Sequence, residues 1–316
     1  MNIRTLYRSM LRIRRIEEAI ADQYGAQEMR CPVHLSIGQE AVAVGVCSAL
    51  RQDDGVFSGH RAHAHYLAKG GNLTSMLAEL YGLEDGCSRG VGGSMHMIDL
   101  RAGFLGAVPI VGATVPLAVG AAWAARLKKE SKVIVIFFGD GTFEEGVVHE
   151  SINFAVLHSL PILFVCENNL YACYTRLSVR QPDRTIHGIA AAHGCHTVVT
   201  DGNDVQSIFD ATTKAVEQLR FGGRPAFIEC STYRWREHCG HNYDDQLGYR
   251  PLGELNSWEA TCPIKQLADQ ISATPGGDLL IARAEQEISE EIDAAFKRAL
   301  ASPLPKQADL QGYLYG

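Results

Sequence analysis

Two short polar motifs stand at the ends of neighbouring apolar runs. The run KVIVIFF ends in Gly-Asp-Gly at residues 139–141, and the run PILFVC ends in Glu-Asn-Asn at residues 167–169. Both runs have the apolar character of buried parallel strands, and helical periodicity separates them. A right-handed crossover returns such strand ends to one edge of a sheet, where ligands of open α/β folds bind. We therefore expect Asp140 and Asn169 to lie close together.

The side chains of these motifs favour a metal ion together with a phosphate. Mg²⁺ takes six hard oxygen ligands in octahedral geometry, and some of them usually come from ligand phosphates. Asp140, the Asn169 amide and one backbone carbonyl would leave the remaining positions to phosphate oxygens and water. Gly141 and Thr142 would lie at the N-terminus of the following helix, where free N–H groups favour phosphate. Each motif alone is a common turn sequence, so the prediction depends on their pairing.

Seven segments in order cover most of the chain: SIGQEAVAVG, HRAHAHYLAKGG, GVGGSMHM, PIVGATVPLAVGAA, GDGTFEEGVVHESINFA, PILFVCENNLYACYT and IECSTYRW. The paired motifs resemble the signature of thiamine-diphosphate enzymes. Together with the other segments they resemble the α subunit of the first component of 2-oxo-acid dehydrogenase complexes, the family of the pyruvate, branched-chain and acetoin dehydrogenases. The resemblance implies a thiamine-diphosphate-binding α/β fold, with a mostly parallel sheet and helices on both faces.

The resemblance also implies which residues contact the cofactor. Mg²⁺ would be bound by the side chains of Asp140 and Asn169 and by the carbonyl of Tyr171. Arg61 would pair with the diphosphate, which suits the fork of a guanidinium. His60 stands where relatives often have a tyrosine that touches the same phosphates. The expected cofactor-binding residues are His60, Arg61, Ile110, Val111, Gly139, Asp140, Gly141, Thr142, Asn169 and Tyr171.

Three histidines are candidates for proton transfer. Histidine titrates near neutrality and can move protons to and from a 2-oxo acid. The resemblance implies that His63 and a histidine on the loop after TYRW line the cavity above the thiazolium ring. Ungapped counting along that loop favours His238, and the neighbouring His241 is a second candidate. A zinc cluster of His238, Cys239 and His241 is not expected, because their spacing matches no standard ligand pattern.

The aminopyrimidine end of the cofactor implies a second chain. In the family, the backbone of the segment that here spans Ile110 and Val111 hydrogen-bonds the ring, and a glutamate from a second α/β domain activates it. A subunit of this family fills the 316 residues and leaves no room for that domain. We therefore expect a separate β subunit that supplies the glutamate, in an α₂β₂ assembly, and a lipoyl acyltransferase as the acceptor.

Three functions follow from these motifs. The first is a subunit of an enzyme that decarboxylates a 2-oxo acid, or cleaves acetoin, and passes the acyl group to a lipoyl carrier. The segment REHCGHNYDD differs from the loop that shapes acceptor access in relatives, and it motivates the second: a carboligase or biosynthetic subunit without a lipoyl acceptor. The third is a non-catalytic interaction subunit. The intact set of Asp140, Asn169, Arg61 and His63 argues against the third.

The elements that must position these residues alternate along the second half of the chain. Apolar runs predict strands at 132–140, 161–168, 196–204 and 225–233, and helical periodicity predicts helices at 6–24, 144–159, 205–222 and 281–302. Ser36 and Gln39 have the spacing of a capping box before an apolar helix. The glycine-rich segment 86–116 predicts a long irregular loop. Because no linker divides the chain, we expect a single domain over 1–316, with an N-terminal helix and a C-terminal helical tail.

Composition limits the partners and the compartment. The 29 basic and 36 acidic side chains give a net charge of −7, so nucleic acid is not an expected partner. Residues 102–125 carry no charge, but prolines and glycines interrupt them too often for a membrane-spanning helix. The 9 cysteines include no C-x-x-C pair and suit reduced thiols, which predicts a cytoplasmic protein.

Overall fold

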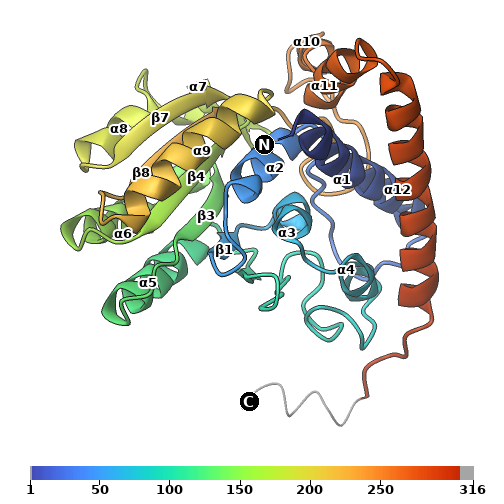
Figure 1. The fold of residues 1–316 in the computed structure, drawn as a ribbon, viewed down its shortest axis with the longest axis horizontal. Helices are drawn as coiled ribbons and strands as arrows, with labels where there is room; N and C mark the ends of the chain where they lie inside the picture. Colours follow the sequence, from blue (N-terminus) through green and yellow to red (C-terminus); the bar gives the residue numbers. More distant parts are fainter. Residues whose placement is uncertain (1, 307–316) are drawn as a thin grey trace.

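A six-stranded parallel sheet forms the centre of the molecule. The computed structural model describes residues 2–306, and its sheet has the order β2-β1-β3-β4-β8-β7 (Figure 1). The strands are β1 Gly55–Ser58, β2 Phe104–Ala107, β3 Ile134–Gly139, β4 Ile162–Asn168, β7 His196–Asp201 and β8 Ala226–Ser231. In the register of β3 and β4, Gly139 lies opposite Glu167. The two polar motifs therefore leave the sheet side by side.

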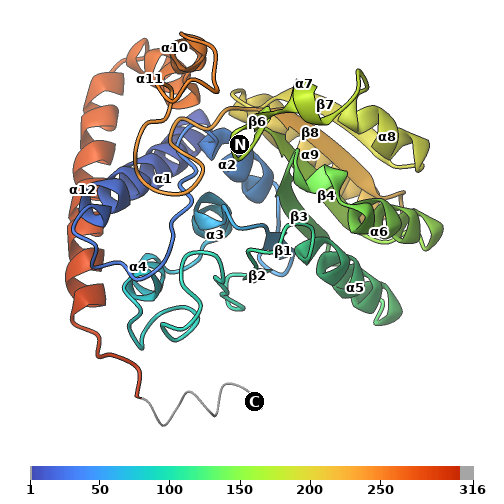
Figure 2. The same cartoon turned by 180° about the vertical axis from the view of Figure 1, so that it is seen from behind.

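Helices cover both faces of this sheet (Figures 1 and 2). One face packs on α5 Thr114–Leu127, α6 Gly146–Leu157 and α8 Ile186–Ala192. The other face packs on α2 Glu40–Ser48, α3 His63–Lys69 and α9 Val205–Arg220. Beyond them lie α1 Ile3–Tyr24, α4 Leu73–Leu80, α11 Pro263–Ser272 and α12 Gly277–Leu300. Because both faces are buried, the central strands are apolar throughout instead of alternating.

Strand β3 shows how the sequence builds this arrangement. Ile134, Ile136 and Phe138 point into the core under α5 and α6, while Val135 and Phe137 point into the opposite core. Successive side chains of a strand alternate between the faces of a sheet, so one unbroken apolar run fills two cores. The polar residues begin only where the strand leaves the sheet.

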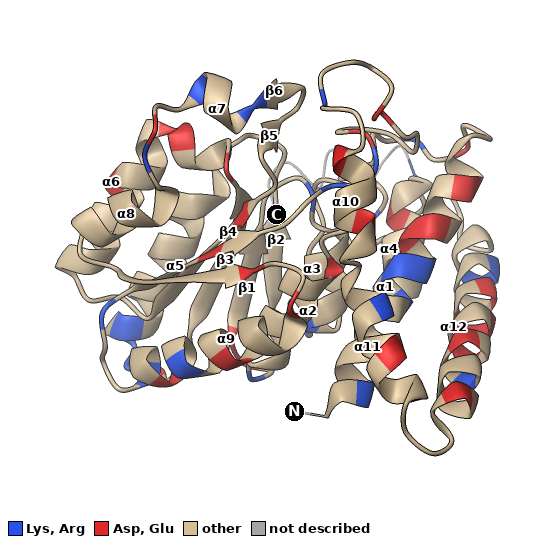
Figure 3. Ribbon diagram, turned by 90° about the horizontal axis from the view of Figure 1, so that it is seen from above, with Lys and Arg blue, Asp and Glu red and all other residues tan. Residues whose placement is uncertain are grey.

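Arginines of α1 pair with acidic residues of the C-terminal helix α12. Arg12 Nη2 lies 2.7 Å from Glu291 Oε1, and Arg15 Nη2 lies 2.6 Å from Glu285 Oε1. Figure 3 shows α1 beside α12, with the charged residues of both helices coloured. The acidic residues of α12 therefore hold this helix against α1.

The remaining elements are short and lie around the ends of the strands. They are the hairpin β5 Tyr171–Ala172 and β6 Thr175–Arg176, the 3-10 turn η1 Thr142–Glu144, and the helices α7 Leu177–Arg180 and α10 Glu254–Ala260. Among the described residues, no helix is both long enough and apolar enough to cross a bilayer.

The structure confirms the predicted strands and helices and corrects three local details. The glycine-rich segment 86–116, predicted as a loop, contains the edge strand β2. Gly141 and Thr142 do not begin an α-helix: Thr142 opens the 3-10 turn η1, and α6 starts only at Gly146. The capping box is also absent. Gln39 is the N-cap residue of α2 but makes no side-chain cap bond, and its amide oxygen instead accepts from Asn169. Gln39, at the start of α2, therefore contacts Asn169 at the end of β4.

Candidate active site

A cavity of about 310 Å³ opens at the carboxyl ends of β1, β3 and β4. This is the edge at which open α/β folds bind their ligands. Its lining comes from the loops after these strands, from the β5–β6 hairpin and from the loop after β8. The lining residues are Gln39, Ser58, Gly59, His60, Arg61, His65, Val111, Phe137, Gly139, Asp140, Gly141, Thr142, Glu144, Glu145, Glu167, Asn169, Tyr171, Ala172, Cys173 and His238.

Asp140 and Asn169 meet at this edge, as the crossover argument predicts. The backbone N–H of Asn169 donates to Asp140 Oδ1 at 3.3 Å, and the Asn169 amide nitrogen donates to Gln39 Oε1 at 3.1 Å. Asn169 Oδ1 accepts the backbone N–H of Tyr171 at 3.2 Å. Leu170 between them has a φ of 71°, a left-handed conformation that few residues without a polar side chain adopt. This tight turn holds both motifs around one point.

The Asp140 carboxylate is buried beside a cation. Its residue is only 1% exposed, and burial raises the pKa of Asp140 while the nearby Arg180 guanidinium acts against that shift. Arg180 pairs with Asp140 and with Glu144, so it places a positive charge beside the carboxylate. A buried carboxylate with amide and carbonyl oxygens around it is the donor set that suits Mg²⁺. The residues present therefore fit the expected ion.

Arg61 is a buried cation without a carboxylate partner among the described residues. Its Nη1 donates to the Leu35 carbonyl at 2.7 Å, and its Nη2 donates to the His238 carbonyl at 3.1 Å. Burial, followed by the charge of Arg234, lowers the pKa of Arg61 to about 9. The guanidinium is still charged at neutral pH, so an anion in the cavity would be stabilised by it.

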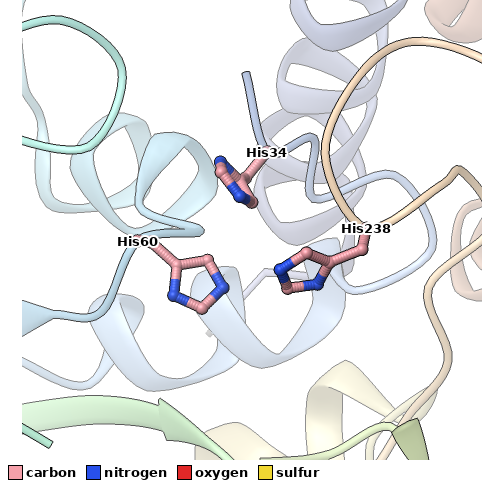
Figure 4. Close-up of side chains that lie close together, drawn as sticks. All are labelled: His34, His60 and His238. Carbon is pink, nitrogen blue, oxygen red and sulfur yellow. The ribbon is translucent and has the colours of Figure 1, made fainter. Parts of the chain in front are cut away.

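Three imidazoles gather beside Arg61 and form the tri-histidine cluster: His34, His60 and His238 (Figure 4). Their ring centroids lie 4.8 to 5.3 Å apart. Burial lowers the pKa of all three rings, and the positive charge of Arg61 lowers it further. The pKa is about 2 for His34, about 4 for His60 and about 3 for His238. All three rings are therefore neutral at neutral pH, and each keeps a nitrogen lone pair that can accept a proton.

His34 is the member of this cluster that the sequence did not reveal. It precedes the segment that starts at Ser36 by two residues, and its backbone forms an isolated parallel bridge with Gly240. That bridge brings the strand-like segment after α1 against the loop that carries His238. The sequence signal that could have pointed to His34 is its position just before SIGQEAVAVG, one of the segments that carry the family resemblance.

His63 and His241 do not line the cavity. His63 is 0% exposed; its Nδ1 lies 2.5 Å from Glu17 Oε1, and its Nε2 lies 2.7 Å from Ser94 Oγ. Its position at the start of α3 turns it toward α1, so it is not among the residues that line this cavity, and its predicted role stays a prediction. His241 packs its ring against Tyr24, with centroids 5.4 Å apart. Of the three candidates, the structure brings only His238 to the cavity.

His65, two residues after His63, occupies the floor of the cavity instead. Its Nδ1 lies 2.8 Å from Ser58 Oγ, and its Nε2 lies 3.3 Å from Glu167 Oε1. The ring stacks on Phe137 with centroids 3.9 Å apart. The i, i+2 relation of the two histidines places them on different sides of α3, which a motif alone does not distinguish.

The loop after β8 is fixed by buried charges, which positions His238. Arg234 Nη1 lies 3.1 Å from Asp244 Oδ2, and Arg250 Nη1 lies 3.3 Å from Asp244 Oδ1. Arg250 also donates to the Arg234 carbonyl at 3.0 Å. These contacts close the loop at its base, so His238 projects from a constrained segment.

The segment after β2 leaves one side of the cavity open. Val111 lines the cavity and is 45% exposed, whereas the neighbouring Ile110 does not line it and is 71% exposed. The Ile110 carbonyl accepts the backbone N–H of Ala113 at 3.1 Å. Two large apolar side chains at the mouth of a polar cavity are typical of a surface that another chain covers.

Known proteins are similar in sequence to this chain over nearly its whole length. A family model described as "Dehydrogenase E1 component" matches residues 8–308. The subunit alpha of acetoin:2,6-dichlorophenolindophenol oxidoreductase from Bacillus subtilis (strain 168) is 38% identical, over 98% of this chain and 92% of that protein. The pyruvate dehydrogenase E1 component subunit alpha of Zymomonas mobilis is 37% identical, over 96% of this chain and 86% of that protein.

A solved structure with low sequence identity to this chain has the same fold. Transketolase from Campylobacter jejuni superposes with a TM-score of 0.62 at 17% identity, and the match covers 89% of this chain. This chain spans 50% of the length of that transketolase, and the likeness shows a shared fold. Because the family match runs from residue 8 to residue 308 and the relatives reach 38% identity, the chain belongs to the dehydrogenase E1 component family.

Proposed function

We propose that this chain is the α subunit of a thiamine-diphosphate-dependent dehydrogenase that acts on a 2-oxo acid or on acetoin. The observation that carries the proposal is the meeting of Asp140, Asn169 and Arg61 in one cavity at the ends of parallel strands. The names of both relatives, a pyruvate dehydrogenase and an acetoin oxidoreductase, favour a dehydrogenase over the carboligase.

The strand ends would hold the diphosphate and its metal ion. Asp140 and the Asn169 amide would bind Mg²⁺ through side-chain oxygens, and Tyr171 through its backbone carbonyl. Arg61 would place its guanidinium against the diphosphate, and His60 would lie beside the same phosphates. The chemistry that the bound cofactor supplies is an electron sink for breaking the bond next to the substrate carbonyl.

The imidazoles of the cluster would move protons. His238 lines the cavity and is neutral at neutral pH, because burial and Arg61 lower its pKa to about 3. Arg61 makes this ring a weak base, and a bound diphosphate would offset the Arg61 charge and so raise the proton affinity of the imidazole. His34, whose ring centroid lies 5.1 Å from that of His238, is a second acceptor in the same space.

A β subunit would complete the site. The exposed Ile110 and Val111 at the cavity mouth suit coverage by a partner, and their backbone would hold the aminopyrimidine ring. The partner would supply the activating glutamate in an α₂β₂ assembly, and a lipoyl acyltransferase would accept the acyl group. The nine free cysteines are consistent with a reducing, cytoplasmic location.

Reconstitution tests this proposal. The full chain alone should show no decarboxylation of pyruvate and no cleavage of acetoin, measured with an artificial electron acceptor, thiamine diphosphate and Mg²⁺. Addition of its cognate β subunit should restore turnover. Full activity of the chain when it is free of other subunits would overturn the partner assignment, and inactivity of the pair on both substrate classes would overturn the substrate assignment.

A further inference from the structure

The tri-histidine cluster combines three segments that are far apart in the sequence. His34 follows α1, His60 follows β1, and His238 lies in the loop after β8. One nitrogen from each ring lies within 4.8 Å of the nitrogens of the other two. In Figure 4 the three rings surround a common space.

The ring nitrogens of this cluster are poorly satisfied by the protein. His34 is 6% exposed, and its buried Nδ1 has no hydrogen-bond partner. Within residues 2–306, the His60 ring makes no hydrogen bond, and the His238 Nδ1 is 3.5 Å from Arg61 Nη2, at the limit of a contact. Buried polar groups in proteins normally have partners, so the unpaired Nδ1 of His34 is a buried nitrogen that is free to take a ligand.

The three imidazoles suit a metal ion of borderline softness, such as Zn²⁺. Neutral imidazole is the form that binds Zn²⁺, and three histidines with one open position form a common zinc coordination set. Histidine has an ordinary pKa of about 6.5, so at neutral pH a metal ion has few protons to displace from imidazole. Mg²⁺ prefers oxygen ligands and would not compete for these nitrogens.

We propose that His34, His60 and His238 bind one Zn²⁺ ion, separate from the expected Mg²⁺ position at Asp140. Nitrogens bound at about 2.0–2.1 Å in tetrahedral geometry lie roughly 3.3 Å apart, so the cluster has to contract by about 1.5 Å at most. His60 and His238 are only partly buried, which leaves their side chains room to move. The fourth position would face the cavity.

Arg61 limits the affinity of this site. Its guanidinium faces His238 Nδ1, so His238 would bind the ion through Nε2. Arg61 contacts the cluster and has no carboxylate partner within residues 2–306, whereas Arg234 is paired with Asp244. The ion is therefore held by imidazole lone pairs against a positive field, which makes the site reversible instead of structural.

Zinc in this cluster would block the enzyme, a consequence that rests on the proposed function. The ion would occupy the lone pairs of His34 and His238 that proton transfer needs, and it would lie beside the phosphate contact expected of His60. Zinc and thiamine diphosphate should therefore weaken each other's binding. The cluster would then make this subunit sensitive to free zinc.

The experiment measures metal binding directly on the full chain. Zn²⁺ is titrated in competition with a chromophoric chelator, and Co²⁺ serves as a spectroscopic probe because tetrahedral Co²⁺ absorbs strongly in the visible range. The variants are His34→Gln, His60→Phe and His238→Ala. The matched control is His196→Gln, an exposed histidine on β7. Circular dichroism checks that each variant folds. If the buried substitution His34→Gln prevents folding, His60→Phe still tests the site, because His60 is partly exposed.

We expect one equivalent of Zn²⁺, and a loss of tenfold or more in affinity for each cluster variant, with the control unchanged. Asp140→Asn should keep its zinc affinity, which separates this site from the Mg²⁺ position. Zinc affinity that all cluster variants retain, no stoichiometric binding, or loss of zinc in Asp140→Asn would each overturn the proposal. If thiamine diphosphate does not bind while zinc does, the proposed function fails and the zinc site stands.

Discussion

The two ends of the cavity hold their polar groups in opposite ways. At the strand ends, charges have partners: Asp140 pairs with Arg180, and Glu167 lies near His65. At the other end, the tri-histidine cluster holds neutral rings with few hydrogen bonds. The charged end has the oxygen donors and charges that suit an ion and phosphates, whereas the imidazole end has neutral rings with nitrogen lone pairs. The same buried location therefore produces different chemistry from different residue types.

The largest expected effect separates catalysis from cofactor binding. His238→Ala should lower turnover by about 100-fold, or about 2.7 kcal/mol in transition-state free energy, because it removes a proton acceptor. The affinity for thiamine diphosphate should change little, since in the proposed function the strand ends, and not His238, would hold the phosphates. Steady-state kinetics and calorimetry on the α–β pair measure both. A fall in cofactor affinity with unchanged turnover would reverse the roles of the two ends.

A second change tests whether His63 is structural. Glu17 contacts His63 Nδ1 and accepts the backbone N–H of Ser36. Glu17→Leu leaves both groups buried and unpaired, so the free energy of unfolding should fall by about 3 kcal/mol. The neighbouring Glu18 is partly exposed, and Glu18→Leu should cost less than about 1 kcal/mol. Equal effects in urea denaturation would contradict a supporting role for the Glu17–His63 contact.

The imidazole end should also make stability depend on pH. The cluster histidines have pKa values of about 2 to 4 in the folded chain, below their ordinary value in the unfolded chain. Between about pH 6.5 and 4 the unfolded state binds more protons, so stability falls as the pH falls. The melting temperature should decline less steeply in His34→Gln than in the wild type. Parallel curves for the two proteins would contradict the buried neutral state of His34.

The smallest expected effect concerns His241. Because its ring packs against Tyr24 outside the cavity lining, His241→Ala should change turnover by less than about threefold. Kinetics under the conditions used for His238→Ala measure this. A loss as large as that of His238→Ala would move the proton-transfer role to His241.

The charged end was predictable from sequence, and the imidazole end only in part. Asp140 and Asn169 follow strands that pair in register, so the crossover rule brings them together. His34 and His238 meet through a backbone bridge between His34 and Gly240, a long-range contact that no local pattern encodes. For His63 and His65, two side chains of one short helix, the structure alone decides which faces the cavity. That the chain forms a single domain stays a prediction.

Calorimetry of thiamine diphosphate binding to the α–β pair tests the central claim most directly. With Mg²⁺ present, the wild type and the control Asp210→Asn, which changes an exposed residue of α9, should bind the cofactor equally. Asp140→Asn, or removal of Mg²⁺ by a chelator, should weaken binding on the order of 100-fold, because the carboxylate that holds the ion is lost. Cofactor affinity that neither Asp140→Asn nor the chelator changes would contradict the account.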